Sequence, residues 1–163
     1  MRSETSRIEG GGLRLVFESP MPVSVGRLFA FHEDPRALEK ISPPFPPARV
    51  VERPERIALG GRILIRIGFG PLSVEWLAEI VEWDPPHGFA DRQVRGPFRS
   101  WFHRHRFLPA PEFGTSLLRD EVDLVAPLGR PGALGARAAM DSFFGFRHRR
   151  TRELLLAADA GRR

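Results

Sequence analysis

Residues 62–126 contain a series of short segments in which apolar and polar side chains alternate, with glycine or proline between one segment and the next. Alternation with a period of two is typical of a half-buried β-strand. Strands that recur about every 8–12 residues, with turn residues between them, predict an antiparallel meander. The predicted strands are residues 62–69, 72–83, 89–94, 100–108 and 115–126, preceded by 13–18 and 50–54. No other feature of the sequence constrains the fold as strongly.

The C-terminal part of the chain changes to a helical period. Between residues 132 and 157, apolar side chains recur at the spacing of one helix face, and arginine fills much of the remainder. Gly132 and Gly135 each lower helix propensity by about 1 kcal/mol relative to alanine. We therefore predict a long helix over residues 137–158.

Two short helices and a stiff loop are expected between the first two strands. Ser24 is a suitable N-cap for a helix that carries Leu28. A second helix is predicted to start near Asp34, with Pro35 in its first turn. The prolines within residues 43–47 then exclude regular structure.

These elements define an α+β fold. A series of strands followed by one long helix buries the apolar face of that helix against one side of a curved sheet. We predict an antiparallel sheet of about six to seven strands around the C-terminal helix, with the two short helices after the first strand. Residues 12–158 form the single predicted domain, and residues 1–11 and 159–163 are predicted to be disordered tails.

Composition and charge limit the classes of function. The chain of 163 residues has no cysteine, which excludes disulfides and thiolate chemistry. No apolar run approaches the roughly 20 residues of a membrane span, and residues 1–10 have no signal-peptide core, so we predict a cytoplasmic protein without integral membrane contact. The net charge of +5 comes from scattered arginines with one tight cluster within residues 147–152, which we expect mainly on the solvated face of the helix. We predict no nucleic-acid partner, and homo-oligomerisation stays open.

Side-chain alternation places two histidines on the inner face of one strand. In residues 100–108, arginines occupy even positions and belong outside. The odd positions therefore face inward, and they are Trp101, His103, His105 and Phe107. On the neighbouring strands the same alternation turns inward Phe89, Asp91, Gln93 and Asp120. Because a buried ion without a partner costs several kcal/mol, these polar groups should pair with one another or with water.

Family resemblance is carried by four motifs, which are Trp83-Asp84-Pro85-Pro86, Phe89-Ala90-Asp91-Arg92-Gln93, Gly96-Pro97-Phe98 with Trp101-Phe102-His103-Arg104-His105, and Asp120-Glu121-Val122. With the order of elements, they resemble the SRPBCC superfamily, the START-like group that includes birch-pollen-allergen-like proteins, lipid-transfer domains and polyketide aromatase/cyclases. The bacterial ligand-binding branch is the most similar, over roughly residues 12–157. The resemblance implies a helix-grip fold with a deep pocket between sheet and C-terminal helix. It does not imply one chemistry, because such folds host many functions.

The inward polar groups allow three interpretations. The first is a satisfied network that fixes strand register at the polar end of a pocket. The second is a recognition site in which His103, His105 and Gln93 bond the polar end of an apolar ligand. The third is chemistry, either by a His–Asp pair acting as general acid and base or by Zn²⁺ on the His-x-His motif. Because no other metal-ligand spacing occurs in the chain, we predict no metal ion and no cofactor.

We predict a binding protein for a hydrophobic or aromatic small molecule, such as a lipid, fatty acyl chain or polyketide-like compound. One alternative is an aromatase/cyclase-like or hydrolase-like enzyme, whose catalytic candidates are His103, His105, Asp91 and Asp120. Another is a protein-interaction module. Arg147 is expected to face the pocket from the helix, and His32 to lie at its mouth. The predicted ligand-binding residues are Phe29, Trp76, Phe89, Asp91, Gln93, Trp101, His103, His105, Phe107, Asp120, Met140, Phe143 and Phe144.

Overall fold

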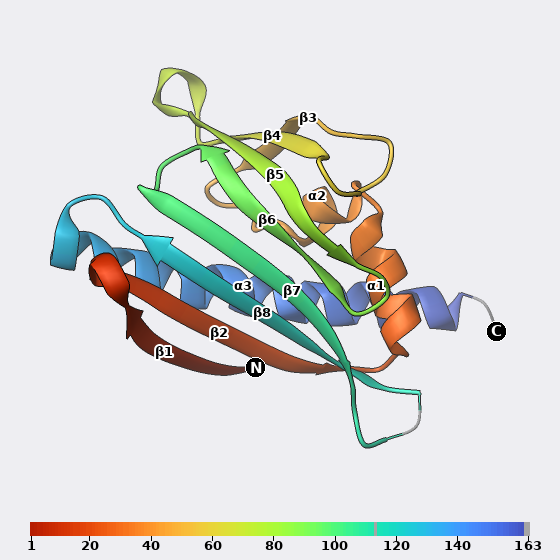
Figure 1. Ribbon diagram of the computed structural model, residues 1–163. Helices are drawn as coiled ribbons and strands as arrows, with labels where there is room; N and C mark the ends of the chain where they lie inside the picture. The colour runs from red at the N-terminus through yellow and green to blue at the C-terminus, as the bar shows by residue number, and fades with distance from the viewer. Residues whose placement is uncertain (113, 162–163) are drawn as a thin grey trace.

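A curved antiparallel sheet wraps around one long helix (Figure 1). The structure is a computed structural model, and it describes residues 1–112 and 114–161. Within these residues, an 8-stranded sheet has the order β1-β2-β8-β7-β6-β5-β4-β3. Its strands are β1 (Arg2–Ile8), β2 (Gly12–Met21), β3 (Ala48–Glu52), β4 (Arg62–Ile67), β5 (Val74–Asp84), β6 (Gly88–Arg95), β7 (Ser100–Pro109) and β8 (Ser116–Val125). The helices are α1 (Val25–Glu33), α2 (Ala37–Ile41) and α3 (Gly129–Ala160), with short 3₁₀ helices at Glu9–Gly11 and Gly70–Leu72.

The strands predicted within residues 62–126 are all present, and each is antiparallel to its neighbours. β5 begins at Val74 because the residues before it form a 3₁₀ turn. In β8 every second residue is buried, from Ser116 to Leu124, as the alternation predicts. The predicted α+β class, with an antiparallel sheet around a C-terminal helix, is confirmed.

The N-terminal residues form a strand, so the prediction of a disordered tail over residues 1–11 is wrong. β1 pairs with β2 along its whole length, from Arg2 to Ile8. Its side chains are almost all exposed, so backbone hydrogen bonds rather than apolar burial hold it in place. Gly10 takes φ 71° in the sharp return to β2. The sheet therefore has more strands than predicted, and α1 and α2 follow the second strand rather than the first.

The short helices begin as their capping residues dictate. Ser24 caps α1, and its Oγ accepts the N–H of Arg27 at 3.4 Å. The second helix starts at Ala37, later than predicted, because Asp34 Oδ1 accepts the N–H of Arg36 at 2.9 Å and holds the chain in a turn.

α3 extends beyond the predicted residues 137–158 at both ends. It begins at Gly129, and at Gly132 a Cβ atom would collide with the carbonyl oxygen of Pro127. Gly132, whose low helix propensity led us to start the helix later, is thus required because the Pro127 backbone passes close to it. The helix also continues to Ala160, where a disordered tail was predicted, while residues 162 and 163 of that tail lie outside the described residues.

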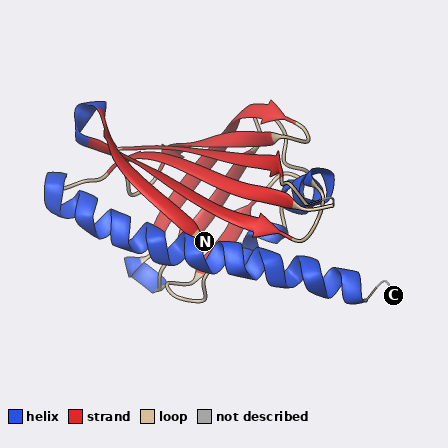
Figure 2. Cartoon of the chain, turned by 90° about the horizontal axis from the view of Figure 1, so that it is seen from below, coloured by secondary structure: helices blue, strands red, loops and turns tan. Residues whose placement is uncertain are grey.

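The concave face of the sheet carries two apolar clusters, and α3 lies across it (Figure 2). The first cluster lies beside α1 and includes Phe29 and Phe107. The second lies nearer the start of α3, where the rings of Phe17 and Phe144 stack at 4.5 Å. Each such buried side chain contributes about 1.5–3 kcal/mol to folding. In the part of the chain that the structure describes, no helix has the length and apolar character needed to span a membrane.

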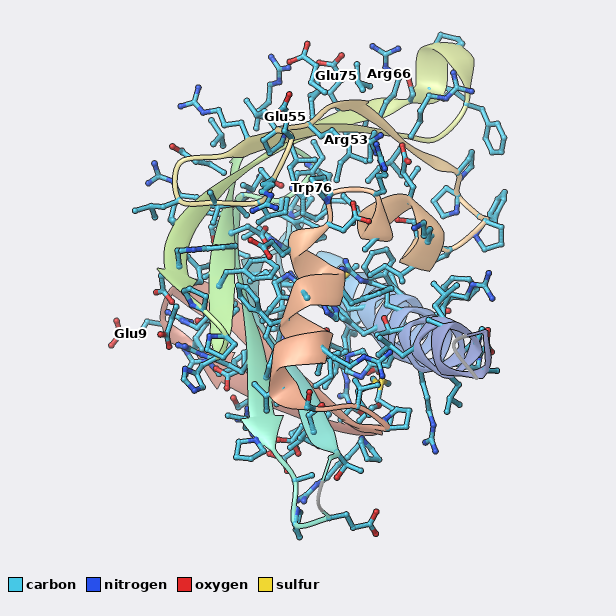
Figure 3. The ribbon with its side chains drawn as sticks, turned by 90° about the vertical axis from the view of Figure 1, so that its right-hand side faces the viewer. Glu9, Arg53, Glu55, Arg66, Glu75 and Trp76 are labelled. Carbon is cyan, nitrogen blue, oxygen red and sulfur yellow. The ribbon has the colours of Figure 1, made fainter. Side chains whose placement is uncertain are left out.

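Ion pairs cover the outer face of the sheet. Glu75 on β5 accepts hydrogen bonds from Arg66 at 3.1 Å and from Arg95 at 2.8 Å. Figure 3 shows Glu75 and Arg66 on the outer surface, while Trp76 turns toward the interior. Exposed pairs of this kind contribute about 0–1 kcal/mol each. The outer face therefore carries exposed ion pairs between neighbouring strands. The side chains that could bind or react with a ligand lie on the inner face.

Candidate functional site

A belt of polar side chains separates the two apolar clusters on the inner face of the sheet. It crosses β2, β8, β7 and β6, which are neighbours in the sheet order, and α3 closes it from the other side. On β8, for example, Asp120 lies between Leu118 of the first cluster and Val122 of the second. The members of this polar belt are Ser19, Asp91, His103, His105, Asp120 and His148.

Asp120 is the centre of the polar belt, and three histidines surround its carboxylate. Its Oδ1 lies 3.2 Å from His103 Nε2 and 2.9 Å from His105 Nδ1, and its Oδ2 lies 2.8 Å from His148 Nε2. The contact with His105 lacks the alignment of a hydrogen bond, so it is electrostatic. His148 Nδ1 lies 2.9 Å from Ser19 Oγ. This surrounding of imidazoles compensates the cost of burying the Asp120 charge.

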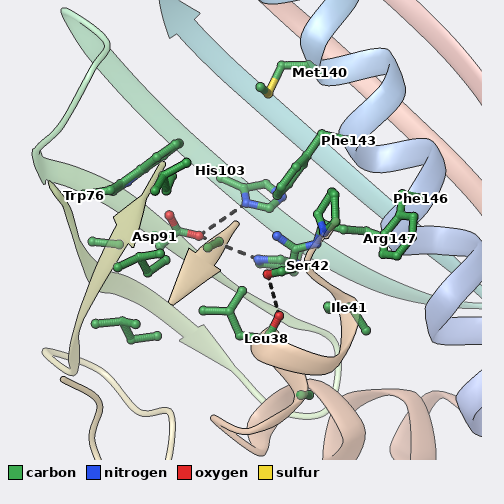
Figure 4. Close-up of a pocket in the computed structure, with 18 of the residues that line it drawn as sticks. Leu38, Ile41, Ser42, Trp76, Asp91, His103, Met140, Phe143, Phe146 and Arg147 are labelled. Carbon is green, nitrogen blue, oxygen red and sulfur yellow. Dashed lines mark hydrogen bonds and ion pairs between the residues drawn. The ribbon is translucent and has the colours of Figure 1, made fainter. Parts of the chain in front are cut away.

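Asp91 faces two of the same imidazoles from the cavity side (Figure 4). Its Oδ2 lies 3.4 Å from His103 Nδ1 and 3.6 Å from His105 Nε2. Both distances exceed the roughly 2.7–3.2 Å of an N–H···O hydrogen bond. His103 and His105 have ring centroids 3.9 Å apart, and each ring turns one nitrogen toward Asp120 and the other toward Asp91.

The belt favours a protonated His103 between two ionised carboxylates. Burial lowers the pKa of His103, but the hydrogen bond to Asp120 and the charge of Asp91 more than offset it, so the pKa is raised. Burial raises the pKa of Asp91 and Asp120, yet the neighbouring imidazoles outweigh burial and lower both pKa values. The belt can therefore hold a proton and two negative charges close together.

His32 lies beside the belt as a neutral imidazole. Burial, with a further contribution from nearby His105, lowers its pKa to about 3. Its Nδ1 lies 2.9 Å from the carbonyl oxygen of Leu28, which fixes that nitrogen as the donor in the neutral ring. His32 lines the cavity.

A cavity of about 810 Å³ lies next to the polar belt, between the sheet, α3 and the segment that contains α2 (Figure 4). Its walls are mainly apolar, with Ile63, Ile65 and Ile67 from β4 and Ile41 from α2. The proline-rich segment 43–46 forms part of its rim. Asp91 and the two β7 histidines lie together in this wall, and its other polar residues include His32, Ser42 and Arg147.

Arg147 adds a positive charge to the cavity wall, as the sequence predicted. Its guanidinium carbon lies 5.3 Å from the ring centroid of Phe143 and 5.8 Å from that of Phe144. Burial lowers the pKa of Arg147, and the charges of Asp120 and Asp91 offset this in part. Arg147 forms no salt bridge with any residue that the structure describes, so its charge is available to a molecule in the cavity.

Most of the predicted ligand-binding residues line the cavity. They are Trp76, Phe89, Asp91, Trp101, His103, His105, Met140 and Phe143. Alternation identified those on strands, because it gives the face of the strand and one face meets the cavity, while Met140 and Phe143 followed from the helical spacing of α3.

Three predicted aromatic residues lie in the core instead. Phe29 and Phe107 pack edge to face at 5.9 Å beneath α1, and Phe144 stacks on Phe17. Alternation gives the face of a side chain but not its distance along the strand from the cavity. The end of β7 that carries Phe107 is covered by α1, so that residue packs against helix rather than open space.

Two predicted polar residues are also displaced from the cavity. Asp120 lies behind the imidazoles of His103 and His105 and contacts them rather than the open space. Gln93 holds the turn between β6 and β7, because its Nε2 donates to the Phe98 carbonyl at 2.8 Å and its Oε1 accepts the Phe98 N–H at 3.3 Å. Neither is a direct ligand contact in this arrangement.

His148 is a member of the belt that the sequence analysis assigned to the solvated face with its basic neighbours. The buried residues of α3 form a single stripe, and they are Phe144, His148, Thr151 and Leu155. Their spacing is that of one helix face, so the apolar period could have placed His148 inside. Arg149, Arg150 and Arg152 are exposed, as predicted.

Asp91, His103 and His105 have the arrangement of a metal-ligand set. One ligand atom from each lies within 4.8 Å of the other two. Side-chain alternation placed these three residues on inner faces of neighbouring strands, and the pairing of β6 with β7, which brings Asp91 opposite His103, sets their distances.

A sheet that grips a C-terminal helix beside a cavity is the architecture of the START-like, helix-grip class predicted from the sequence, and comparison with solved structures bears this out. A Rhodobacter sphaeroides protein matches with TM-score 0.71 and 18% identity, over 96% of this chain and 99% of that one. A START superfamily protein from Mycobacterium smegmatis matches with TM-score 0.69 and 12% identity, over 89% and 98%. Ara h 8.0201 matches with TM-score 0.61 and 14% identity, over 88% and 97%. At these identities the likeness shows the fold alone.

A family model described as polyketide cyclase/dehydrase and lipid transport matches residues 21–144. The chain belongs to this family, which confirms the predicted membership of the SRPBCC superfamily. A comparison with curated proteins gives no match.

Proposed function

We propose that the protein binds an apolar or aromatic small molecule, such as a lipid, a fatty acyl chain or a polyketide-like compound, in the cavity between the sheet and α3. The observation that carries this proposal is a large, mainly apolar cavity with a few polar groups in its wall, Asp91, His103 and His105 among them. Its volume of about 810 Å³ falls in the range of roughly 300–1,000 Å³ common for small-molecule sites. Membership of a family whose description includes lipid transport supports the same class of ligand.

The chemistry of the wall indicates how such a molecule lies. The isoleucines of β4 and the ring of Trp76 suit its apolar part, since burying apolar surface stabilises a complex by about 25 cal/mol per Å². Its polar end is suited to His103 and His105 of β7 and to the positive charge of Arg147 on α3, which all line the cavity. We therefore expect ligands with a carboxylate, carbonyl or hydroxyl at one end to bind more tightly than hydrocarbons of equal size.

Binding is tested with a panel of fatty acids and planar aromatic polyketides by thermal shift and titration calorimetry. Ile65→Trp fills the cavity, while Leu64→Trp places the same bulk on the outer face of β4 and is the matched control. We expect tight binding by the wild type and Leu64→Trp, and binding weaker by about tenfold or more, or about 1.4 kcal/mol, in Ile65→Trp. The proposal fails if the wild type binds no member of the panel, or if the two tryptophan variants bind equally.

A second candidate is acid–base catalysis in the same cavity, favoured by the raised pKa of His103 beside Asp91. A protonated imidazole next to an ionised carboxylate can donate and accept protons in an aldol-type cyclisation or dehydration. If this candidate holds, His103→Gln and His105→Gln lower the cyclisation rate of a poly-β-ketone substrate by at least about 100-fold. Unchanged turnover in both folded variants removes it, and leaves the binding proposal standing.

A further inference from the structure

We infer that Asp91, His103 and His105 form a mononuclear site for a divalent transition-metal ion, best suited to Zn²⁺, with an open coordination position toward the cavity. The three ligand atoms are Asp91 Oδ2, His103 Nδ1 and His105 Nε2. Two imidazoles and one carboxylate are a donor set that zinc accepts in catalytic sites, where a fourth position is left for water or substrate.

The distances within this ligand set suit a metal better than a hydrogen bond. Zinc binds imidazole nitrogen and carboxylate oxygen at about 2.0–2.2 Å, so two ligands of one tetrahedral ion lie about 3.3–3.5 Å apart. The Asp91 oxygen lies 3.4 Å from one imidazole nitrogen and 3.6 Å from the other. Both separations are too long for direct hydrogen bonds and close to the edge of such a tetrahedron.

Asp120 supplies the outer support that a histidine–metal site requires. Metal-bound histidines usually present their second ring nitrogen to a carboxylate, which fixes the ring and raises its basicity. Asp120 Oδ1 lies 3.2 Å from His103 Nε2 and 2.9 Å from His105 Nδ1, and these are the nitrogens that face away from Asp91. Asp120 therefore holds His103 by a hydrogen bond and attracts His105 by its charge, and both rings turn their other nitrogen toward Asp91.

The charge of the site favours a cation despite Arg147. Asp91 and Asp120 together balance a divalent ion when both histidines are neutral, and Arg147 leaves one positive charge for an anionic fourth ligand. The histidine side chains are 4% and 6% exposed and that of Asp91 is 15% exposed, so the set opens toward the cavity through its carboxylate side. A metal there competes with the proton on His103, so its affinity increases as the pH rises.

The open coordination position determines which chemical groups the site can bind. A zinc ion in an apolar cavity binds the carboxylate, hydroxamate or enolised carbonyl end of a molecule whose remainder contacts the isoleucine wall. Metal binding itself does not rest on the proposed function, because it is measured without any organic ligand.

The test is a Co²⁺ and Zn²⁺ titration of the full chain after dialysis against a chelator. We expect one equivalent of Co²⁺ to give the intense visible bands of four- or five-coordinate cobalt, and Zn²⁺ to abolish them. His103→Gln, His105→Gln and Asp91→Asn should each weaken Zn²⁺ binding by at least about tenfold, as should Asp120→Asn through loss of outer support. His87→Gln is the control. His87 is exposed, its Nδ1 lies 3.9 Å from Asp84 Oδ1, and it is not one of the proposed ligands.

Two results overturn the inference. One is a wild-type protein that binds well below one equivalent, or that gives only the weak spectrum of octahedral cobalt. The other is undiminished binding in every ligand variant that folds by circular dichroism, since the ion would then lie elsewhere. If a buried histidine variant does not fold, Asp91→Asn, whose side chain is the most exposed of the set, still tests whether the ion lies there.

Discussion

At the scale of single residues, Asp120 joins the sheet to α3 through charge. Its carboxylate contacts two histidines of β7 and one of α3 inside the protein, where an ion pair broken on one side is strongly destabilising. The same strand carries Asp123 on its outer face, where Arg14 donates two hydrogen bonds to it at 2.7 Å. The two residues therefore offer the same chemistry on opposite faces of one strand.

This pair of positions gives a stability prediction. Asp120→Asn should lower the free energy of unfolding by about 3–5 kcal/mol, because it leaves imidazoles without their buried counter-charge. Asp123→Asn should lower it by no more than about 1 kcal/mol, because its pair is exposed. Urea denaturation of both variants measures the difference. Equal losses in the two variants would show that the contribution of Asp120 to stability does not depend on its burial.

A second prediction concerns pH and His32. Its pKa is about 3 in the folded protein and 6.5 when unfolded, so the unfolded chain takes up a proton that the folded protein excludes. Stability should fall between pH 6.5 and 5 by up to about 1.4 kcal/mol per pH unit. His103 acts in the opposite sense, since its raised pKa gives stability that is present below pH 6.5 and is lost as the pH rises through its folded pKa.

His32→Phe separates these two contributions. It should flatten the acid side of the stability–pH curve above pH 5, where carboxylates do not yet titrate. The loss of stability above pH 6.5 that comes from His103 should stay unchanged. Chemical denaturation across this pH range is the measurement. An acid slope that persists in the variant would assign the proton uptake to another group.

The sequence predicted which residues lie on the inner face, but not how deep they lie. Trp101 and Phe107 occupy equivalent alternating positions of β7, yet one lines the cavity and the other packs under α1. Depth depends on where the helices cross the sheet, and no local pattern encodes that. His148 was misplaced for a different reason, since its charged neighbours concealed a regular buried stripe.

At the scale of elements, the backbones of β6 and β7 approach closely at Gly88, beside the strand that carries both histidines. Gly88 begins β6, and a Cβ atom there would collide with the carbonyl oxygen of His105. β6 also carries Asp91, so the approach fixes the relation of that carboxylate to the imidazoles across the ladder. Backbone contact of this kind leaves no room for a side chain.

We predict that Gly88→Ala lowers the free energy of unfolding by about 1–3 kcal/mol through overpacking. It should also weaken the binding of any ligand or metal that contacts β6 and β7. Gly26→Ala in α1 is the control, because a Cβ there meets nothing within 4 Å and alanine favours helix by about 0.5–1 kcal/mol. Thermal melts of the two variants should move in opposite directions. A neutral Gly88→Ala would mean that the strands separate without cost.

Element boundaries were predictable where side chains carry the signal. The central strands followed from alternation, and α1 followed from its Ser24 cap. β1 was missed because backbone pairing holds a strand whose exposed polar side chains show no apolar pattern. The start of α3 was missed because Gly132 is selected by a tertiary contact that overrides helix propensity.

At the scale of the whole molecule, the apolar core borders the cavity, and some core residues, such as Ile63 and Trp101, also line it. Two apolar clusters stabilise the two ends of the inner face, and the polar belt between them ends at the cavity. Other residues that hold the fold, such as Phe17 and Phe144, need not contact a ligand. The cavity wall can vary in sequence to suit different molecules, as expected of a fold that hosts many functions.

The central claim is that the cavity holds an apolar molecule, and native mass spectrometry of protein purified without detergent tests it most directly. Wild type and Leu64→Trp should retain a non-covalent mass that organic solvent extracts, and Ile65→Trp should lose it. If the wild type carries none, incubation with a cell lipid extract should load it in the same pattern. A wild-type protein that stays at its bare chain mass after loading, or an Ile65→Trp variant that loads equally, would contradict the account.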